Sequence, residues 1–413
     1  MTGTHNRLFV PVPKLGTVTH FWSPQHPQIF SNAEVRRQTG NYESAVAAKL
    51  AMWSAEIDAQ LAAELEEATN SLRSFDTFAS ASLGTSSPEL GPMSSILLRT
   101  ESASSSQIEQ LSTSAKQLAL WEINESQKSN AQTVIGNVRA MEAALKLSEN
   151  LSVEMILAMH SELLSHQLDM AEEAGKLRRE LVWIGGKDNA GPRGASYVAP
   201  QHELIPEALD DLIDFMNRHD VPALVQVAVA HAQFETIHPF VDGNGRTGRA
   251  LAHAMLRKRK ITVNTTAPVS AGILRNTQAY FEALTEFRNG NAYPIIKIFI
   301  NASIYAAATG EQLVSTLAQI MQQSRMKLSG IRSNSSVFKI LPLLIAQPIV
   351  NANYLKKTLG INDAGAQRSL AVLAERGVLK EKTGQSRNRI WQHDQVLAAL
   401  DEYAKTIRRD TVR

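Results

Sequence analysis

The sequence predicts a mainly helical protein, and three features indicate this class. Residues 45–72 carry apolar side chains at helical spacing in a stretch rich in Ala, Glu and Leu. Pro206 suits the first turn of a helix whose apolar stripe includes Leu209 and Met216. Before the C-terminal part, strand-like pattern is limited to one short segment near residue 190. The helices are therefore expected to form the core, with one small β element beside them.

The overall composition is that of an ordinary globular protein. Its 413 residues suggest two or three domains, and 44% hydrophobic residues are enough for real cores. A formal charge of +2 is too small to imply a nucleic-acid or membrane partner for the whole chain. The absence of cysteine excludes disulfides, thiol nucleophiles and thiolate metal sites. With a polar start and no run of eighteen apolar residues, a cytoplasmic protein without membrane contact is expected.

The elements follow one another as helices joined by polar loops. The chain up to about Thr39 contains several prolines and is expected to be irregular, and residues 80–92 form a loop of Ser, Gly and Pro. No internal repeat is apparent. Besides residues 45–72, helices are expected over residues 118–147, from Ser152 and from Pro206, and over residues 224–236, 280–287 and 295–308.

The short β element is predicted to be a hairpin. Residues 181–184 and 197–198 are rich in β-branched and aromatic side chains and flank a glycine-rich turn over residues 185–194. The edge of a hairpin exposes unpaired N–H and C=O groups, which can dock an extended peptide. A hairpin that only covers the core is the alternative.

The most informative stretch is His238-Pro-Phe-Val-Asp-Gly-Asn-Gly-Arg-Thr-Gly-Arg249. Its glycines allow positive φ, and the apolar run after them indicates a helix that starts at the turn, where unpaired N–H groups can bind a phosphate. Arg246 and Arg249 share one helix face and can bind several phosphate oxygens together. Near neutral pH, His238 can accept a proton, and Asp242 with substrate phosphates is a sufficient Mg²⁺ site.

Other site types fit this stretch poorly. An EF-hand calcium loop would need Asp or Asn at Arg246, Gly at Thr247 and Glu at His253. A zinc site built from His231, His238 and His253 would lack cysteines and a His-Glu-x-x-His pattern. His231 and His253 are therefore expected to be ordinary helix residues. A glycine-rich turn capped by a structural histidine is the remaining alternative.

This stretch resembles the signature of the Fic family, His-x-Phe-x-Asp/Glu-Gly-Asn-Gly-Arg-x-x-Arg, at every defined position. Most Fic proteins transfer AMP from ATP to a hydroxyl of a target protein. The resemblance implies that His238 deprotonates this hydroxyl, that Asp242 holds Mg²⁺ and that Phe240 anchors the loop. The residues it assigns to ATP and its phosphates are Gly243, Asn244, Gly245, Arg246 and Arg249. The predicted hairpin is similar in position to the flap that aligns the target, which implies contacts from Trp183, Ile184, Tyr197 and Val198.

Residues 104–110, Ser-Ser-Ser-Gln-Ile-Glu-Gln, are similar to the family's inhibitory motif, Ser/Thr-x-x-x-Glu-Gly/Asn. Ser105 and Glu109 occupy its key positions, whereas Gln110 departs from the usual Gly or Asn. The resemblance implies that Glu109 pairs with Arg249 and keeps the γ-phosphate out of its productive pose. A carboxylate can compete with a phosphate because both make the same forked bonds to a guanidinium. A helix cap with Glu109 on a solvated face is the alternative.

The C-terminal part is similar in layout to a winged helix-turn-helix. Helices are expected over residues 337–345, 353–359 and 364–376, and a two-stranded wing over residues 377–391. A local basic excess is formed by Arg368, Lys380, Lys382, Arg387 and Arg389. DNA binding and protein docking are equally favoured for this part.

The expected fold is thus mainly α, a Fic-type helical core with a β-hairpin flap and a C-terminal winged helix. The expected parts are an N-terminal helical region with the inhibitory motif (1–110), the catalytic core (111–310), a connecting segment (311–331) and the winged domain (332–413). The expected function is an ATP- and Mg²⁺-dependent protein adenylyltransferase inhibited in cis. Expected partners are a hydroxyl-bearing target protein, the chain itself as a target, a second copy in a homodimer, and DNA or protein at residues 332–413. The alternatives are a DNA-binding regulator with a nucleotide-sensing Fic domain, or a Fic enzyme that transfers another phosphate-linked group or removes AMP.

Overall fold

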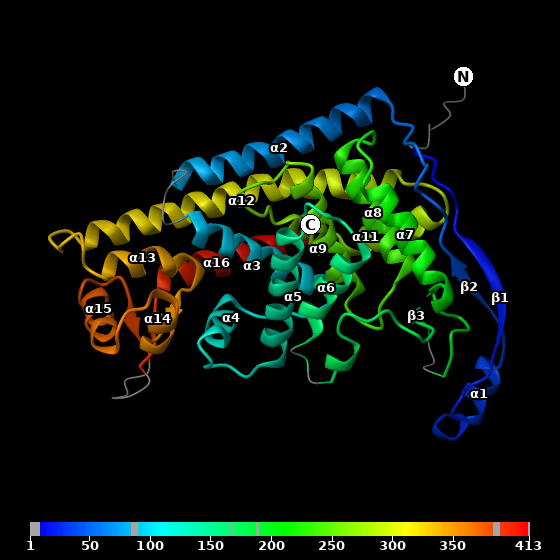
Figure 1. Ribbon diagram of the computed structural model, residues 1–413, viewed down its shortest axis with the longest axis horizontal. Helices are drawn as coiled ribbons and strands as arrows, with labels where there is room; N and C mark the ends of the chain where they lie inside the picture. The colour runs from blue at the N-terminus through cyan, green and yellow to red at the C-terminus, as the bar shows by residue number, and fades with distance from the viewer. Residues whose placement is uncertain are drawn as a thin grey trace. The chain divides into compact units, whose positions relative to one another are not determined.

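The structure is a computed structural model that describes residues 9–83, 90–165, 167, 169–186, 190–382 and 389–411. This part of the chain is mainly helical, as predicted (Figure 1). Its strands are β1 (Gly16–Trp22), β2 (Gly40–Val46), β3 (Trp183–Ile184), β4 (Tyr197–Val198), β5 (Ile349–Val350), β6 (Lys380–Glu381) and β7 (Trp391–Gln392). Its helices are α1 (Asn32–Gln38), α2 (Ala59–Leu83), α3 (Leu90–Ile108), α4 (Ala115–Glu122), α5 (Ser129–Lys146), α6 (Val153–Leu164), α7 (Ile205–Met216), α8 (Ala223–Ile237), α9 (Asn244–Lys258), α10 (Val269–Leu274), α11 (Thr277–Arg288), α12 (Tyr293–Lys327), α13 (Val337–Ala346), α14 (Ala352–Leu359), α15 (Asp363–Glu375) and α16 (Asp394–Thr411).

The contacts divide the chain into two compact units. Unit 1 consists of the described residues within Met1–Leu65, Ala143–Arg259 and Gln278–Ile300. Unit 2 consists of those within Glu66–Glu142, Lys260–Thr277 and Asn301–Arg413. The domain boundaries expected from the sequence stay a prediction. No helix in the described ranges is both long enough and apolar enough to cross a bilayer.

The core of unit 1 is built around α8. Almost every side chain of this helix is buried, and it packs against α7 and α9, while α6 packs against α7 and α9. Ser152 caps α6 by accepting from the Met155 N–H, and a proline lies in the first turn of α7, so the predicted starts of both helices are confirmed.

The N-terminal segment differs from the prediction. Instead of an irregular stretch followed by a helix from residue 45, β1 and β2 form an antiparallel ribbon that pairs Gly16 with Val46 and Trp22 with Gly40. The helix expected over residues 45–72 begins only at Ala59. The ribbon was missed because β1 has no alternation of buried apolar and exposed polar residues, and its Val18 and Phe21 side chains are themselves exposed.

Three other boundaries also differ. The stretch expected as one helix over residues 118–147 is divided into α4 and α5, and Asn124 adopts a left-handed φ of 61° at the break. The loop expected over residues 80–92 is shorter, because α2 continues to Leu83 and α3 begins at Leu90; residues 84–89 lie outside the described part. Helix α12 extends well beyond residue 308, to Lys327.

Unit 2 is organised around α3. This helix packs against α10 and α13, and α16 packs against α10 and α4. The Ser270 N–H at the start of α10 donates to the Glu101 carboxylate of α3 at 2.9 Å, so a buried acidic side chain joins the two helices. Towards the C-terminus, β5, β7 and β6 form a small antiparallel sheet beside α13, α14 and α15.

Candidate active site

The end of α8, the loop of residues 238–243 and the start of α9 bring the predicted motif together in unit 1. His238 directly follows the last residue of α8, has left-handed torsion angles (φ 50°, ψ 61°) and donates its N–H to the Phe234 carbonyl. Gly243, with φ 78°, precedes the first turn of α9, and no side chain in the described part of the chain caps this helix. The helix predicted to start at the turn is therefore confirmed, and its first N–H groups can bind an anion.

Asn244 closes the loop between these helices. Its Oδ1 accepts from the Phe240 N–H at 2.9 Å, and its Nδ2 donates to the Phe240 carbonyl at 2.9 Å. Phe240 itself is completely buried, as expected of an anchor. The Asn244 amide therefore holds the shape of the loop, and backbone N–H groups and arginines are further donors for a phosphate.

His160 on α6 supports the same loop, although the sequence analysis did not select it. Its ring stacks on Phe240 with centroids 3.6 Å apart and an interplanar angle of 2°. Its Nδ1 accepts from the Gly175 N–H at 3.0 Å, so its Nε2 carries the proton and donates to the Asp242 carbonyl at 3.0 Å. A single polar residue on the apolar stripe of this helix was the only sequence signal.

The charged groups of the motif lie where the turn begins. Asp242 pairs with Arg246 at 2.8 Å, and the Asp242 side chain is 46% exposed whereas that of Arg246 is 2% exposed. Arg249 is also buried, on the same helix. The exposed Asp242 carboxylate can therefore meet a ligand from solvent, while the two arginines are buried.

The described residues contain no cluster of three or more metal-ligating side chains. A Mg²⁺ site needs no such cluster, because this ion can be held by one carboxylate together with phosphate oxygens and water. Asp242 is thus the residue that could hold such an ion. His231 and His253 are buried on α8 and α9, as expected of ordinary helix residues.

His238 lies in surroundings that keep its ring neutral. Burial first, and then the positive charges of Arg178 and Arg288, lower the pKa of His238 to about 4, against weaker opposition from the Glu235 carbonyl and the Asp242 charge. Glu235 Oε2 lies 3.9 Å from His238 Nδ1. A histidine with this pKa is unprotonated at neutral pH and can act as a base.

The predicted hairpin is present, and its residues differ in exposure. Trp183 pairs with Val198 and Ile184 pairs with Tyr197. Ile184 is 43% exposed, whereas Tyr197 is buried, donates its hydroxyl to the Thr236 carbonyl and lies under the Arg288 guanidinium at 3.7 Å. Tyr197 and Val198 therefore fix the hairpin to the core, and Ile184 and Trp183 leave more surface for a target.

The N-terminal ribbon packs against this hairpin. Arg193 in the hairpin turn donates to the carbonyls of Arg37, Thr39 and Asn41, and the Trp22 indole donates to the Ala190 carbonyl. A groove of about 860 Å³ lies between β2 and residues 192–198. Residues 187–189 of the predicted turn lie outside the described part.

The predicted inhibitory residues lie at the end of α3, in unit 2. Ser105 is completely buried, and Glu109 follows the last residue of the helix. Gln110 has a left-handed φ of 64°, and the Leu111 N–H donates to the Ser106 carbonyl, as in a Schellman ending. Gly and Asn are the residues that adopt this conformation most easily, which is a physical reason for their place in the family's motif.

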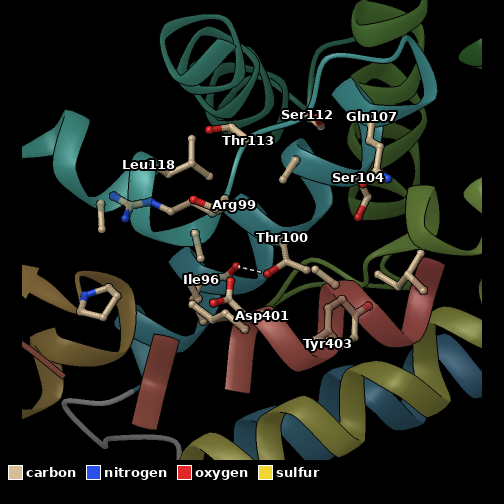
Figure 2. Close-up of a pocket in the computed structure, with 18 of the residues that line it drawn as sticks. Ile96, Arg99, Thr100, Ser104, Gln107, Ser112, Thr113, Leu118, Asp401 and Tyr403 are labelled. Atoms are coloured by element: carbon tan, nitrogen blue, oxygen red, sulfur yellow. Dashed lines mark hydrogen bonds between the residues drawn. The ribbon is translucent and has the colours of Figure 1, made fainter. Parts of the chain in front are cut away.

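A small cavity adjoins this same helix (Figure 2). It has a volume of about 110 Å³ and lies between α3, the segment around α4, and α16. Ser104 and Gln107 of α3 line it together with Asp401 and Tyr403 of α16. Thr100 donates to the Ile96 carbonyl at 2.8 Å within the helix, so its hydroxyl is already engaged.

In the C-terminal part, the order of elements is α13, β5, α14, α15, β6 and β7. Part of the predicted basic surface is neutralised, since Lys382 pairs with Asp394 at 3.2 Å and Arg389 pairs with Glu381. Arg368 and Lys380 are exposed, and Arg387 lies outside the described residues.

The segment that carries the site is similar to known proteins. Residues 150–256 match the family described as Fic/DOC. Protein adenylyltransferase fic-1 of Caenorhabditis briggsae is 33% identical over 116 residues, which are 27% of this chain and 20% of that protein. Protein adenylyltransferase Fic of Drosophila melanogaster is 28% identical over 203 residues, or 48% of this chain and 38% of that protein. The chain thus spans well under half the length of these relatives.

Among solved structures, a Fic family protein from Desulfovibrio desulfuricans G20 matches with a TM-score of 0.48 and 21% identity, covering 82% of this chain and 97% of the other. Fic-1 (residues 134–508) from Caenorhabditis elegans matches with a TM-score of 0.47 and 21% identity, covering 62% and 75%.

Proposed function

We propose that this protein transfers AMP from ATP to a hydroxyl side chain of a target protein. The observation that carries the proposal is the junction of α8 and α9. It places a neutral histidine, His238, at one end of a short loop and an uncapped helix N-terminus, beginning at Asn244, at the other. A base and an anion seat held on one rigid loop are the two elements that phosphoryl-type transfer requires.

In the proposed reaction, His238 accepts the proton of the target hydroxyl as its oxygen attacks the α-phosphorus of ATP. The new bond joins this oxygen to phosphorus, the bond to the β-phosphate oxygen breaks, and pyrophosphate leaves. The N–H groups at the start of α9 and the guanidiniums of Arg246 and Arg249 compensate the phosphate charge. Bound Mg²⁺, held by Asp242, would supply further charge neutralisation of the phosphates.

Labelled nucleotides test this function directly. Incubation with [α-³²P]ATP should label protein, whereas [γ-³²P]ATP should not, because pyrophosphate leaves. The His238→Ala variant should lose the label but keep ATP affinity, since the imidazole acts on the hydroxyl and not on the nucleotide. Label from [γ-³²P]ATP would indicate phosphate transfer instead. Release of AMP from a pre-labelled target without added pyrophosphate would indicate that the protein hydrolyses the AMP bond and removes AMP.

The proposal includes inhibition in cis by Glu109, in which this carboxylate occupies Arg249 in the resting protein. Support comes from the ending of α3, where Gln110 takes the left-handed conformation suited to the Gly or Asn of the family's inhibitory motif. Glu109→Gly should raise labelling by about ten- to a hundredfold if a charge-assisted pair of about 1.5–3 kcal/mol is removed. The double variant with Arg249→Ala should lose this gain. An unchanged rate in folded, ATP-binding Glu109→Gly would end the inhibitory interpretation.

For the C-terminal part, we propose a winged helix that docks a protein. The order of its helices and strands supports the fold. The ion pairs of Lys382 and Arg389 favour a protein partner over DNA, because they remove positive charge from the wing. The full chain should therefore show no duplex DNA binding at physiological salt in a mobility-shift assay. A sequence-specific shift under these conditions would favour a DNA-binding regulator instead.

A further inference from the structure

Arg178 is a buried arginine whose guanidinium donates to three backbone carbonyls. Its side chain lies on the chain segment that precedes β3, and the residue is 2% exposed. Nε donates to the His238 carbonyl at 2.8 Å, Nη1 to the Glu180 carbonyl at 2.8 Å, and Nη2 to the Pro200 carbonyl at 2.7 Å. No ion pair to Arg178 occurs among the described residues. The side chain is therefore placed by its hydrogen bonds and not by a carboxylate.

The three carbonyls belong to different parts of the site. Glu180 lies just before β3 and Pro200 just after β4, so they mark the two ends of the hairpin. The third carbonyl is that of His238, the proposed base. One planar side chain thus ties both ends of the hairpin to the catalytic loop. Lysine cannot replace it, because an ammonium group lacks the planar fork that reaches three acceptors in fixed directions.

The contact with the catalytic loop falls at its most strained residue. A left-handed conformation is unfavourable for a residue with a Cβ, and His238 has φ 50°. The Arg178 side chain donates to the carbonyl of this residue, and the Arg178 N–H donates to the next carbonyl, Pro239 O, at 3.0 Å. One residue therefore holds two successive carbonyls of the loop. These bonds also fix the direction of the His238 imidazole.

We infer that Arg178 is a positioning residue that holds the target-docking hairpin and the His238 ring in a fixed relation. The inference rests on the proposed function, since it concerns the distance between a docked hydroxyl and the base. The positive charge of Arg178 also favours the neutral ring of His238. The other charged groups that act on this ring are Arg288, Glu235 and Asp242. The nucleotide is bound by other residues, so Arg178 should affect transfer to the target more than ATP affinity.

The test compares Arg178→Lys, which keeps the charge but loses the fork, with Arg178→Gln, which loses both. Arg218→Lys is the control for the loss of an arginine fork, because Arg218 also donates to two backbone carbonyls, of Ala51 and Trp53, and lies outside the site, although it additionally pairs with Asp220. Arg178→Lys should lower kcat/KM for the target by about ten- to a hundredfold, as expected for a small misplacement of the reacting groups. The ATP affinity of Arg178→Lys should stay within about twofold of the wild-type value. The control variant should match the wild type in both kcat/KM and ATP affinity.

Two measurements do not require activity. Amide exchange at Ala199, whose N–H donates to the Val182 carbonyl across the hairpin, should accelerate in Arg178→Lys but not in the control. In an NMR titration, the pKa of His238 should rise in Arg178→Gln and stay close to the wild-type value in Arg178→Lys.

The inference would be overturned, whatever the activity, if both Arg178 variants showed the wild-type rate of amide exchange in the hairpin and the wild-type pKa of His238. An equal loss of ATP affinity and transfer would also overturn it, because it would indicate a purely structural role. If the wild-type protein itself transfers no AMP, the proposed function fails, and the exchange and titration data still decide whether Arg178 couples the hairpin to His238.

Discussion

Replacing Gly243 by alanine tests the geometry of the turn on which the phosphate seat depends. Gly243 has φ 78°, and a Cβ built on it would lie 2.7 Å from Leu163 Cδ2 and 3.6 Å from the His160 ring. The left-handed conformation costs a residue with a Cβ about 1–2 kcal/mol. Overpacking against a buried side chain adds about 1–3 kcal/mol. Gly243→Ala should therefore lower the free energy of unfolding by roughly 2–5 kcal/mol.

Gly330 provides the control, because its φ is 81° and a Cβ added there would have no neighbouring atom within 4 Å. Gly330→Ala should show only the conformational cost of about 1–2 kcal/mol. Urea unfolding of both variants separates the cost of the left-handed conformation from the cost of overpacking. In the [α-³²P]ATP assay, Gly243→Ala should lose at least about tenfold in transfer, since displacement of reacting groups by about 1 Å can cost a hundredfold. Equal unfolding free energies and equal transfer rates for the two variants would refute this account of the turn.

The remaining predictions concern the inhibitory helix, pH and metal. Gln110→Gly should raise the free energy of unfolding by about 0.5–1 kcal/mol, because glycine adopts the left-handed backbone conformation of residue 110 without strain. Gln107→Gly within α3 should lower the free energy of unfolding by a similar amount in the same urea titration. Burial lowers the pKa values of His231 (to about 3) and His238 (to about 4) below the unfolded value of about 6.5. In pH-dependent denaturation, the free energy of unfolding should therefore have its full value above pH 6.5 and decrease between pH 6.5 and 4, by about 3 kcal/mol for His238. A flat profile would contradict the burial of both rings in the neutral form. Asp242→Ala and EDTA should each stop labelling from [α-³²P]ATP, and undiminished labelling in EDTA would argue against Mg²⁺.

The sequence by itself determined the local features of this protein. The helix that begins at the glycine-rich turn, the cap at Ser152, the first-turn position of Pro206 and the hairpin with Ile184 were all predicted from neighbouring residues and then found. Capping, helical periodicity and turn conformation depend on residues a few positions apart, so their signals are contained in short stretches of sequence.

Tertiary structure decided which side chains hold the site together. Arg178 reaches a carbonyl 60 residues away and His160 reaches one 82 residues away, and both bonds end on backbone atoms, which have no residue type to recognise. The same holds for the ribbon of residues 16–46, whose anchoring bonds come from the distant Arg193. Long-range hydrogen bonds to the backbone leave no pattern in a single sequence, because any residue can supply the acceptor.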